Sequence, residues 1–316
     1  TCPITEGKAA RIMTGAPVPE GADAIIMHER TSFTENTVTL TAPVTSANII
    51  PPGEDVAAGT LLVPKGKILT ASDLALIAGQ GIAEIGVYKK LSIGLISTGS
   101  ELLNTGSPLE YGKIYNTNPY LLGGYIQKHH MTANYLNTVS DDLDSLCRAV
   151  LEALKTNDIV ITTGGVSAGD FDYMPEVIRR IGGDLLFHRL KFKPGGAMLG
   201  AFKDGKVILG LSGNPGAAAT GLLCVGFPFM RKLSGRSDIT FSQATAYLGV
   251  DFKKSSPVTR ILKGHSDFRN GMLYFIPLSN QHNGSVSSMS DCDLLAVIPA
   301  GSEPLAAGDK LEVYIL

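Results

Sequence analysis

The spacing of apolar residues changes twice along the chain and divides it into three stretches. In residues 9–88 the apolar positions come in short β-branched bursts punctuated by Pro and Gly, a pattern typical of small antiparallel sheets. One helix is expected over residues 71–78, with Ser72 as its N-cap. The bursts cover residues 24–27, 37–40, 60–63 and 82–87.

Residues 91–235 instead alternate between buried-type strands and amphipathic helices. This alternation implies parallel pairing through right-handed crossovers, and therefore a three-layer α/β domain. Strands are predicted over residues 91–98, 134–139, 158–163 and 185–192, with a hairpin formed by 198–202 and 206–211. Helices are predicted over residues 119–129, 143–154, 175–181 and 216–233.

The last stretch, from about residue 240 to 316, has a β pattern again. The predicted fold class is multidomain α/β plus β, in which a central three-layer α/β domain with a mostly parallel sheet is flanked by β-rich domains. The C-terminal strands are expected over residues 244–252, 272–277, 294–299 and 310–315.

Charge and cysteine usage exclude several classes of protein. The 316 residues carry 27 basic and 29 acidic side chains, a net charge of -2, so no positive field draws the chain onto nucleic acid or an anionic membrane. The four cysteines are scattered without a CxxC pair, which argues against a zinc site and a disulfide framework and favours a reducing, cytoplasmic compartment. The most apolar run, residues 221–230, is too short to cross a bilayer.

Small polar loops follow the predicted strands of the central stretch. In a parallel sheet such loops emerge at one edge, where open α/β folds place their ligands, so we expect them to meet in one crevice. The loops are Ser97-Thr98-Gly99-Ser100-Glu101, Ser140-Asp141-Asp142, residues 162–172, residues 191–196 and Leu211-Ser212-Gly213-Asn214-Pro215.

The residue types in these loops suit a phosphate-bearing ligand. Glycine and serine let backbone N–H groups approach an anion closely, and a helix that begins just after the loop adds its positive end. The carboxylates of Glu101, Asp141 and Asp172 suit a divalent cation. Arg189 and Lys193, four apart near the end of one predicted strand, suit phosphate or oxyanion charge. Phosphoryl or nucleotidyl chemistry is therefore indicated.

The common nucleotide motifs are missing. Residues 164–169 have the GxxxxG spacing, but Asp170-Phe171 stands where a P-loop needs Lys followed by Ser or Thr, and Gly79-Gln80-Gly81 lacks the third glycine of the dinucleotide fingerprint. A Gly-Gly turn after a strand is also often simple turn chemistry. Asp141 has the alternative role of a helix cap.

Several motifs along the chain resemble those of a known family, the MoeA and gephyrin E-domain family of molybdopterin molybdenumtransferases. The resemblance runs in order along the chain, with no counterpart here for the family's opening segment, so the chain is expected to be N-terminally truncated. The motifs are Ala10-Arg11-Ile12-Met13-Thr14-Gly15-Ala16-Pro17-Val18-Pro19, Ser97-Thr98-Gly99-Ser100-Glu101-Leu102, Gly164-Gly165-Val166-Ser167-Ala168-Gly169, Lys193-Pro194-Gly195 and Gly213-Asn214-Pro215.

The resemblance implies the last step of molybdenum cofactor biosynthesis. Adenylylated molybdopterin is bound, AMP is released in a step that depends on Mg²⁺ and molybdate, and molybdenum is inserted into the dithiolene. It further implies a homodimer, with molybdopterin adenylyltransferase and molybdoenzymes or their chaperones as protein partners. The implied divisions are part of a β-rich domain at 1–46, a linker or dimerisation region at 47–90, a molybdopterin-binding-like α/β domain at 91–236 and a β-barrel-like domain at 237–316.

The resemblance also assigns roles to residues. Metal and pyrophosphate handling falls to Glu101, Asp141 and Asp172, with Glu101 and Asp172 as the metal ligands. Arg189 and Lys193 counter phosphate or molybdate charge, unless they are a solvated strand end, and Thr14 reaches a site built with the partner, unless it only satisfies a turn. The residues expected to bind the pterin nucleotide are Thr98, Gly99, Gly164, Gly165, Ser167, Gly213, Asn214 and Pro215.

Several positions depart from the family pattern and leave a second function open. Basic residues are usual at 50–52, where this chain has Ile-Pro-Pro, and Lys-Pro is usual where it has Gly196-Ala197. Asp is usual at Ser100 and common at Asn116, and Ala-Asn-Gly is common at residues 291–293. The alternative is a catalytically weakened molybdopterin-binding or scaffold paralogue. A tungstate-preferring variant and an unrelated nucleotide-binding enzyme are the other possibilities.

Overall fold

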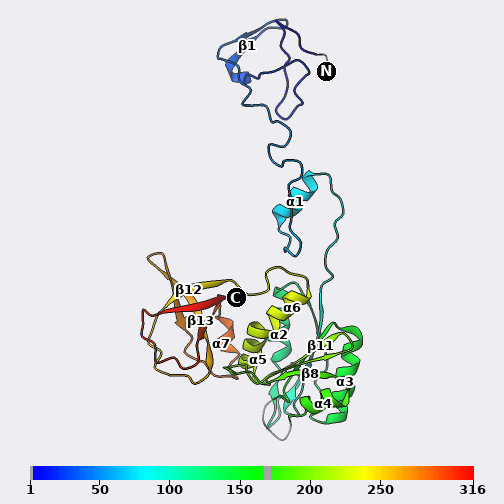
Figure 1. The fold of residues 1–316 in the computed structure, drawn as a ribbon, viewed down its shortest axis with the longest axis vertical. Helices are drawn as coiled ribbons and strands as arrows, with labels where there is room; N and C mark the ends of the chain where they lie inside the picture. Colours follow the sequence, from blue (N-terminus) through cyan, green and yellow to red (C-terminus); the bar gives the residue numbers. More distant parts are fainter. Residues whose placement is uncertain (1–2, 167–171) are drawn as a thin grey trace. The chain divides into compact units, whose positions relative to one another are not determined.

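The computed structural model describes residues 3–166 and 172–316, which form two compact units, 1–63 and 64–316 (Figure 1). The first unit has the 3-10 turn η1 (His28–Arg30) and a two-stranded antiparallel sheet of β1 (Thr31–Phe33) and β2 (Val38–Leu40). Of the predicted bursts, 37–40 is largely a strand, 24–27 contributes only the isolated bridge from Ile25 to Thr45, and 60–63 forms none.

The second unit begins with helix α1 (Ala71–Gly79), which has a reciprocal cap at its start. The Thr70 hydroxyl accepts from the Asp73 backbone N–H at 3.3 Å, and the Asp73 carboxylate accepts from the Thr70 N–H at 2.9 Å. The prediction of Ser72 as N-cap is therefore wrong, because the capping box selects the Thr that precedes Asp by three residues. The burst at 82–87 is not a strand, and Val87 is 70% exposed.

The central sheet has six strands, four of which are parallel neighbours. The next strand runs antiparallel to both of its neighbours, so the final one points the same way as the first four. The order is β6 (Thr132–Tyr135), β3 (Ser92–Ser97), β7 (Ile159–Thr163), β11 (Lys206–Leu211), β10 (Leu199–Lys203) and β8 (Asp184–His188). The expected mostly parallel sheet is confirmed.

Helices cover both faces of this sheet and complete the three layers (Figure 1). One face is covered by α2 (Asn118–Lys128), α5 (Pro215–Gly221) and α6 (Phe227–Leu233), with a π-helical turn, η2 (Leu222–Gly226), between the last two. The other face is covered by α3 (Leu143–Thr156) and α4 (Met174–Arg180).

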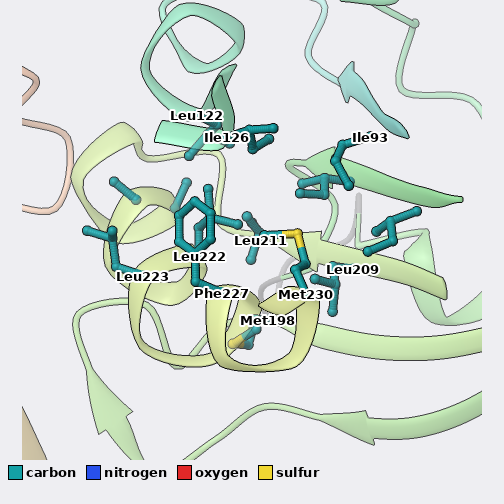
Figure 2. Close-up of a cluster of buried hydrophobic side chains, with 14 of the residues drawn as sticks. Ile93, Leu122, Ile126, Met198, Leu209, Leu211, Leu222, Leu223, Phe227 and Met230 are labelled. Carbon is teal, nitrogen blue, oxygen red and sulfur yellow. The ribbon is translucent and has the colours of Figure 1, made fainter. Parts of the chain in front are cut away.

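Alternate residues of the central strands enter different cores, as the period of two in a strand requires. On β7, Ile159 and Ile161 join the first core while Val160 joins the second, and all three are fully buried. Figure 2 shows the first core, where Leu122 of α2 and Phe227 of α6 pack with the strand residues. Strands buried on both faces explain why their sequences are continuously apolar.

The C-terminal strands close into a barrel. Strand β13 pairs with both β14 and β15, and the ring continues through β16 and β12 back to β14. The sequence pattern did not predict β13, the longest strand, because polar residues interrupt its apolar run. The barrel strands are β12 (Gln243–Leu248), β13 (Thr259–Arg269), β14 (Met272–Pro277), β15 (Leu294–Ile298) and β16 (Lys310–Ile315), with a short helix α7 (Ser287–Ser290).

The predicted strand at 185–192 is two separate strands. Strand β8 ends at His188, the chain turns at Arg189 with a φ of 67°, and β9 (Phe192–Lys193) joins the barrel along β13. Arg189 and Lys193 therefore do not lie on one strand, which corrects the prediction. The predicted strand is divided because its two parts pair with different strands. Residues before the turn pair with β10, and residues after it pair with β13 of the barrel.

Candidate active site at the carboxyl edge of the central sheet

The carboxyl ends of β6, β3, β7, β11 and β8 lie at the same edge of the central sheet because these strands run in the same direction. The loops that follow the strands form the rim, defined here as residues 98–101, 140–142, 164–166, 212–215 and 189. Open α/β folds bind ligands at this edge. The structure thus brings together the described parts of four predicted strand-end loops, whereas the fifth, residues 191–196, comes after the turn at Arg189 and pairs in part with the barrel.

Backbone contacts join neighbouring loops of the rim. The Thr98 N–H donates to the Thr163 carbonyl at 2.9 Å, and the Gly164 N–H donates to the Leu211 carbonyl at 3.0 Å. A Cβ added to Gly213 would lie 3.6 Å from the Cα of Gly164, so these two glycines are in close approach. The predicted ligand-binding residues Thr98, Gly164 and Gly213 therefore adjoin one another, with Thr98 buried.

Two glycines of the rim make room for functional groups. Gly99 lies under the Glu101 carboxylate, because a Cβ at position 99 would be 2.7 Å from Oε2. Gly164 has a φ of 102°, and a Cβ there would be 2.5 Å from the Thr98 hydroxyl oxygen. The lack of a side chain at these two glycines thus allows the carboxylate and the hydroxyl to approach the backbone closely, while the Gly99 and Gly164 N–H groups donate to the carbonyls of Val139 and Leu211.

The two acidic residues that follow β6, Asp141 and Asp142, have different partners. Asp142 is the N-cap of α3 and accepts from the Ser145 N–H at 2.8 Å. The pKa of Asp142 is lowered to about 2 by the hydrogen bond from the Ser140 hydroxyl, the largest cause, and by the hydrogen bond from the Ser145 N–H. Asp141 instead accepts from the Ser100 N–H at 3.2 Å. The cap is therefore Asp142, and Asp141 faces the loop that carries Glu101.

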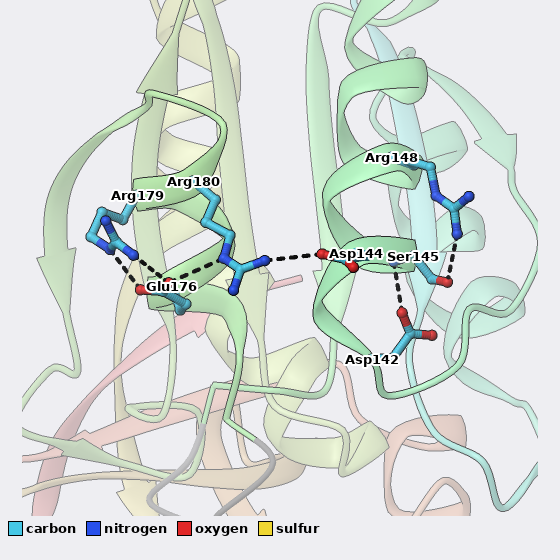
Figure 3. Close-up of polar contacts among 7 residues, drawn as sticks. All are labelled: Asp142, Asp144, Ser145, Arg148, Glu176, Arg179 and Arg180. Atoms are coloured by element: carbon cyan, nitrogen blue, oxygen red, sulfur yellow. Dashed lines mark hydrogen bonds and ion pairs between the residues drawn. The ribbon is translucent and has the colours of Figure 1, made fainter.

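Arg179 and Arg180 of α4 form ion pairs with acidic side chains of α3 and α4. Figure 3 shows Arg180 of α4 paired with Asp144 of α3 at 2.9 Å, while Glu176 receives hydrogen bonds from Arg179 and Arg180. The pKa of Glu176 is lowered to about 2, and the largest cause is the hydrogen bond from Arg179. The pairs with Glu176 lie within α4, and the Arg180–Asp144 pair, which joins α4 to α3, is exposed and therefore adds little stability.

The loop after β7 returns close to its own start. The Met174 N–H donates to the Gly165 carbonyl at 3.1 Å, which brings the segment after Asp172 beside the end of β7. Asp172 is half-buried and lies two residues before α4. Ser167, a predicted ligand-binding residue, lies outside the described residues.

The turn after β8 provides basic residues from two elements. The Arg189 N–H donates to the Met198 carbonyl at 2.8 Å, which fixes the turn at the start of β10. Lys193 on β9 lies in parallel register with Arg260 on β13. Sequence reasoning missed Arg260 because it missed its strand. The guanidinium of Arg260 lies over the ring of Phe252 at 5.8 Å, so the shared register is one of the backbone.

Two buried asparagines at the start of α2 connect the rim loops and were also missed as site residues. Asn116 accepts from the Ser97 hydroxyl and donates to the Thr138 hydroxyl, both at 3.3 Å. Asn118 donates to the Gly213 carbonyl at 2.8 Å. The Asn-x-Asn spacing immediately before a helix was the available signal, since amides there reach neighbouring loops.

The barrel supports the rim from the side of α5. Asn214 is the N-cap residue of α5, and Pro215 is its first residue. The Ala217 N–H donates to the Asn283 carbonyl of the barrel at 3.1 Å. The fully buried Lys263 of β13 donates to the His282 carbonyl at 3.2 Å and to the Ser288 hydroxyl. The loop 282–288 is thereby fixed against the start of α5.

The donor set at the rim fits Mg²⁺. Within the described ranges, no group of three His, Cys, Asp or Glu side chains forms a closed metal cage. Mg²⁺ is usually held by one or two carboxylates together with substrate phosphates and water. Glu101 and Asp141, on loops joined by the hydrogen bond from the Ser100 N–H to Asp141, are carboxylates of this kind.

Thr14 belongs to the first unit, where it is exposed in the turn from Met13 to Ala16. The Ala16 N–H donates to the Met13 carbonyl at 3.0 Å, and Gly15 has a φ of 81°. The turn is thus closed by backbone groups and glycine. The Thr14 side chain is presented at the surface.

Comparisons with known proteins agree along the whole chain. The sequence matches family profiles described as MoeA N-terminal region (domain I and II) over residues 1–81, probable molybdopterin binding domain over 94–232 and MoeA C-terminal region (domain IV) over 245–316. It is 36% identical over 313 residues to a molybdopterin molybdenumtransferase of Staphylococcus aureus (strain MRSA252), which covers 99% of this chain and 75% of that protein. The counterpart in Bacillus subtilis (strain 168) is 36% identical over 314 residues, covering 98% and 73%.

A solved structure gives the same result for the fold. The molybdopterin biosynthesis moeA protein from Pyrococcus horikoshii OT3 superposes with a TM-score of 0.80 at 27% identity, covering 99% of this chain and 77% of that one. The expected molybdopterin-binding-like fold is confirmed. In the described part of the chain, no helix is both long and apolar enough to span a membrane.

Proposed function

Because the chain belongs to the molybdopterin molybdenumtransferase family, and is therefore a transferase of molybdenum cofactor biosynthesis, we propose that it binds adenylylated molybdopterin and releases AMP. The release depends on Mg²⁺ and molybdate, and molybdenum is then inserted into the dithiolene. This is the last step of the pathway.

The contact between Asp141 and the Ser100 N–H is the observation that carries the proposal. It places a carboxylate that does not cap a helix beside the loop that presents Glu101 over Gly99. Two carboxylates on adjoining loops suit a metal ion that is bound together with a phosphate chain. When bound, Mg²⁺ would neutralise charge on the pyrophosphate; Glu101 and Asp172 are the ligands we propose for it, and Asp141, which contacts the loop of Glu101, would serve the pyrophosphate.

The chain's own residues perform the remaining tasks. Thr98, Gly99, Gly164 and Gly165 offer backbone and hydroxyl groups to the phosphates, and Gly213, Asn214 and Pro215 complete the surface at the start of α5. Arg189 and Lys193, with Arg260 beside Lys193, stabilise the negative charge that develops as the phosphoanhydride bond breaks. Ser167 is proposed as a further ligand-binding residue.

The proposal includes the assembly and its partners. The chain acts as a homodimer in which Thr14 reaches a site shared with the second subunit. It receives its substrate from a molybdopterin adenylyltransferase and delivers its product to molybdoenzymes or their chaperones. Free thiols at Cys147, Cys224 and Cys292 suit the reducing cytoplasm.

The test is an AMP-release assay with adenylylated molybdopterin, Mg²⁺ and molybdate. Wild-type protein is expected to release AMP only when both inorganic components are present. Omitting Mg²⁺ or changing Glu101→Gln is expected to reduce the rate about 100-fold or more. Release that is independent of both the metal and Glu101 contradicts the proposal.

One structural observation favours the scaffold alternative. At Gly196, where the family usually has Lys, a Cβ would overlap the backbone carbonyls of Leu190 and Phe192. The turn is therefore built for glycine, and one cation of the family pattern is absent from the site. Tight substrate binding without AMP release would identify the chain as a scaffold.

A further inference from the structure

A small cavity lies next to the rim, outside the residues assigned to phosphate, metal and oxyanion. Its volume is about 240 Å³. It is enclosed by the loop after β4 (Leu102–Leu103), the start of α2 and the end of β6, with β5 (Ile114–Tyr115) in parallel register with β4. Its lining includes Asn104, Thr105, Asn116, Tyr120, Tyr135 and Thr138.

Two lining residues set an upper limit on the separation between this cavity and the candidate active site. Asn104 follows Glu101 by three residues, and Thr138 precedes Asp141 by three residues. Three residues of extended chain span about 10 Å at most. A group bound in the cavity is therefore within reach of phosphates held at the rim by the same two loops.

Two tyrosines provide a planar wall. The ring centroids of Tyr120 and Tyr135 are 6.2 Å apart with an interplanar angle of 31°, and the residues are 62% and 49% exposed. Tyr135 lies against Gly123 of α2, where a Cβ would be 2.5 Å from its hydroxyl oxygen. The glycine thus allows the ring to occupy this position, and the half-exposed ring retains aromatic surface for stacking.

The polar lining suits the edge of a heterocycle rather than a charged group. Asn116 is 6% exposed and is held between the Ser97 and Thr138 hydroxyls. Asn104 and Thr105 add amide and hydroxyl groups at the opening. None of the described residues that line the cavity is charged. Amides and hydroxyls offer both donors and acceptors, as ring nitrogens and exocyclic groups require.

We propose that this cavity binds an uncharged, planar nitrogen heterocycle, stacked on Tyr135, which is one of the two ring systems of the substrate. The inference rests on the proposed function for the identity of that substrate. A cavity of this size is below the range of about 300–1,000 Å³ typical of pockets for complete ligands, so it accommodates a single ring system. Adenine and pterin share the required chemistry.

The experiment measures equilibrium binding of two probes, AMP by dialysis and 6-carboxypterin by its own fluorescence. The chain has no tryptophan, which leaves the pterin signal undisturbed. Tyr135→Leu is expected to weaken one probe about tenfold, since stacking of a base on an aromatic ring contributes about that much or more. Gly123→Ala should weaken the same probe, because the new Cβ displaces the Tyr135 ring.

Matched controls are present in the same region. Gly124, the next residue of α2, has nothing within 4 Å of an added Cβ, and Tyr111 is fully exposed. Gly124→Ala and Tyr111→Leu should leave the affinities of both probes unchanged. Circular dichroism of each variant verifies that it is folded.

The outcomes separate this inference from the proposed function. Weaker AMP binding in the Tyr135 variant identifies adenine as the occupant, and weaker carboxypterin binding identifies pterin. Probe binding that depends on Tyr135 in a protein that releases no AMP sustains the cavity and contradicts the proposed function. Unchanged affinity in both the Tyr135 and the Gly123 variants, or binding of neither probe at millimolar concentration, overturns the inference.

Discussion

The Ser100 backbone N–H donates a hydrogen bond to Oδ2 of Asp141 at 3.2 Å, which connects two loops that are 41 residues apart in the sequence. The neighbouring Asp142 caps α3. Adjacent carboxylates with the same charge thus have different tasks, one in the candidate active site and one in the fold. Their variants are therefore a matched pair.

Asp141→Asn is expected to reduce AMP release about 100-fold while leaving the melting temperature nearly unchanged, because a charge near the phosphates is lost and a hydrogen-bond acceptor is kept. Asp142→Ala should do the reverse, lowering the melting temperature by a few degrees through loss of the cap, with turnover within a factor of about three. Turnover and calorimetric melting are measured on both. Equal loss of turnover in the two variants contradicts the division of tasks.

Lys263 and Ser288 are expected to be energetically coupled. The Lys263 ammonium is fully buried and bonds to the Ser288 hydroxyl and the His282 carbonyl. Lys263→Met removes the donor to both oxygens, although Ser288 keeps its bond to the Ser285 carbonyl at 3.0 Å, and should lower the free energy of unfolding by about 1–3 kcal/mol. In a urea-unfolding double-mutant cycle, Ser288→Ala should cost about 1 kcal/mol less in the Lys263→Met background than in the wild-type protein. Additive effects of the two changes would exclude the coupling.

Gly196→Lys, which introduces the residue usual in the family, is expected to destabilise the protein by about 2 kcal/mol or more. Its Cβ would overlap the carbonyls of Leu190 and Phe192, so the turn must shift. Gly124→Lys on the open face of α2 is the control and should be neutral or slightly stabilising. Urea midpoints compare the two. An increase of AMP release in Gly196→Lys without loss of stability would show that the turn is adaptable.

Stability should fall on acidification because of His129. The pKa of His129 is lowered from an ordinary value of 6.5 to about 4. Burial is the largest cause, and the positive charge of Arg231 is the next. The ring packs edge-on against Phe227 and Phe241, and Arg236, Lys128 and His130 add positive charge around it. Below pH 6.5 the unfolded chain binds a proton that the folded chain does not, so stability falls as the pH drops from 6.5 to 4.

The free energy of unfolding is expected to fall by about 1 kcal/mol over this pH range. This is less than the full pKa shift of His129 implies, because the ring is only half-buried. His129→Gln should remove this part of the pH dependence. Urea unfolding of both proteins at pH 7, 5.5 and 4.5 makes the comparison. Parallel stability curves for the two proteins would exclude His129 as the source.

The sequence predicted the central domain well because strands buried on both faces are read as unbroken apolar runs. Val160, between Ile159 and Ile161, is an example, since each side of the sheet has its own core. Strand β13 was missed because the buried Lys263 interrupts its pattern, and its burial depends on partners in a distant loop. The division of the chain into four stretches stays a prediction beside the two compact units.

The candidate site was predicted as a set of loops, but its pairings were not. Topology alone brings Glu101, Asp141 and Gly164 to one edge. The choice between Asp141 and Asp142 as helix cap depends on side-chain geometry, and the partner of Lys193 is on a strand from another domain. Such contacts between distant segments leave no local pattern in the sequence.

The most direct test is a crystal structure of the protein grown with adenylylated molybdopterin and with Mn²⁺ in place of Mg²⁺, since anomalous scattering locates the metal. We predict a metal peak at the Glu101 carboxylate, with the pyrophosphate over Gly99 and Gly164. Substrate and metal bound away from the carboxyl edge of the central sheet would contradict the account.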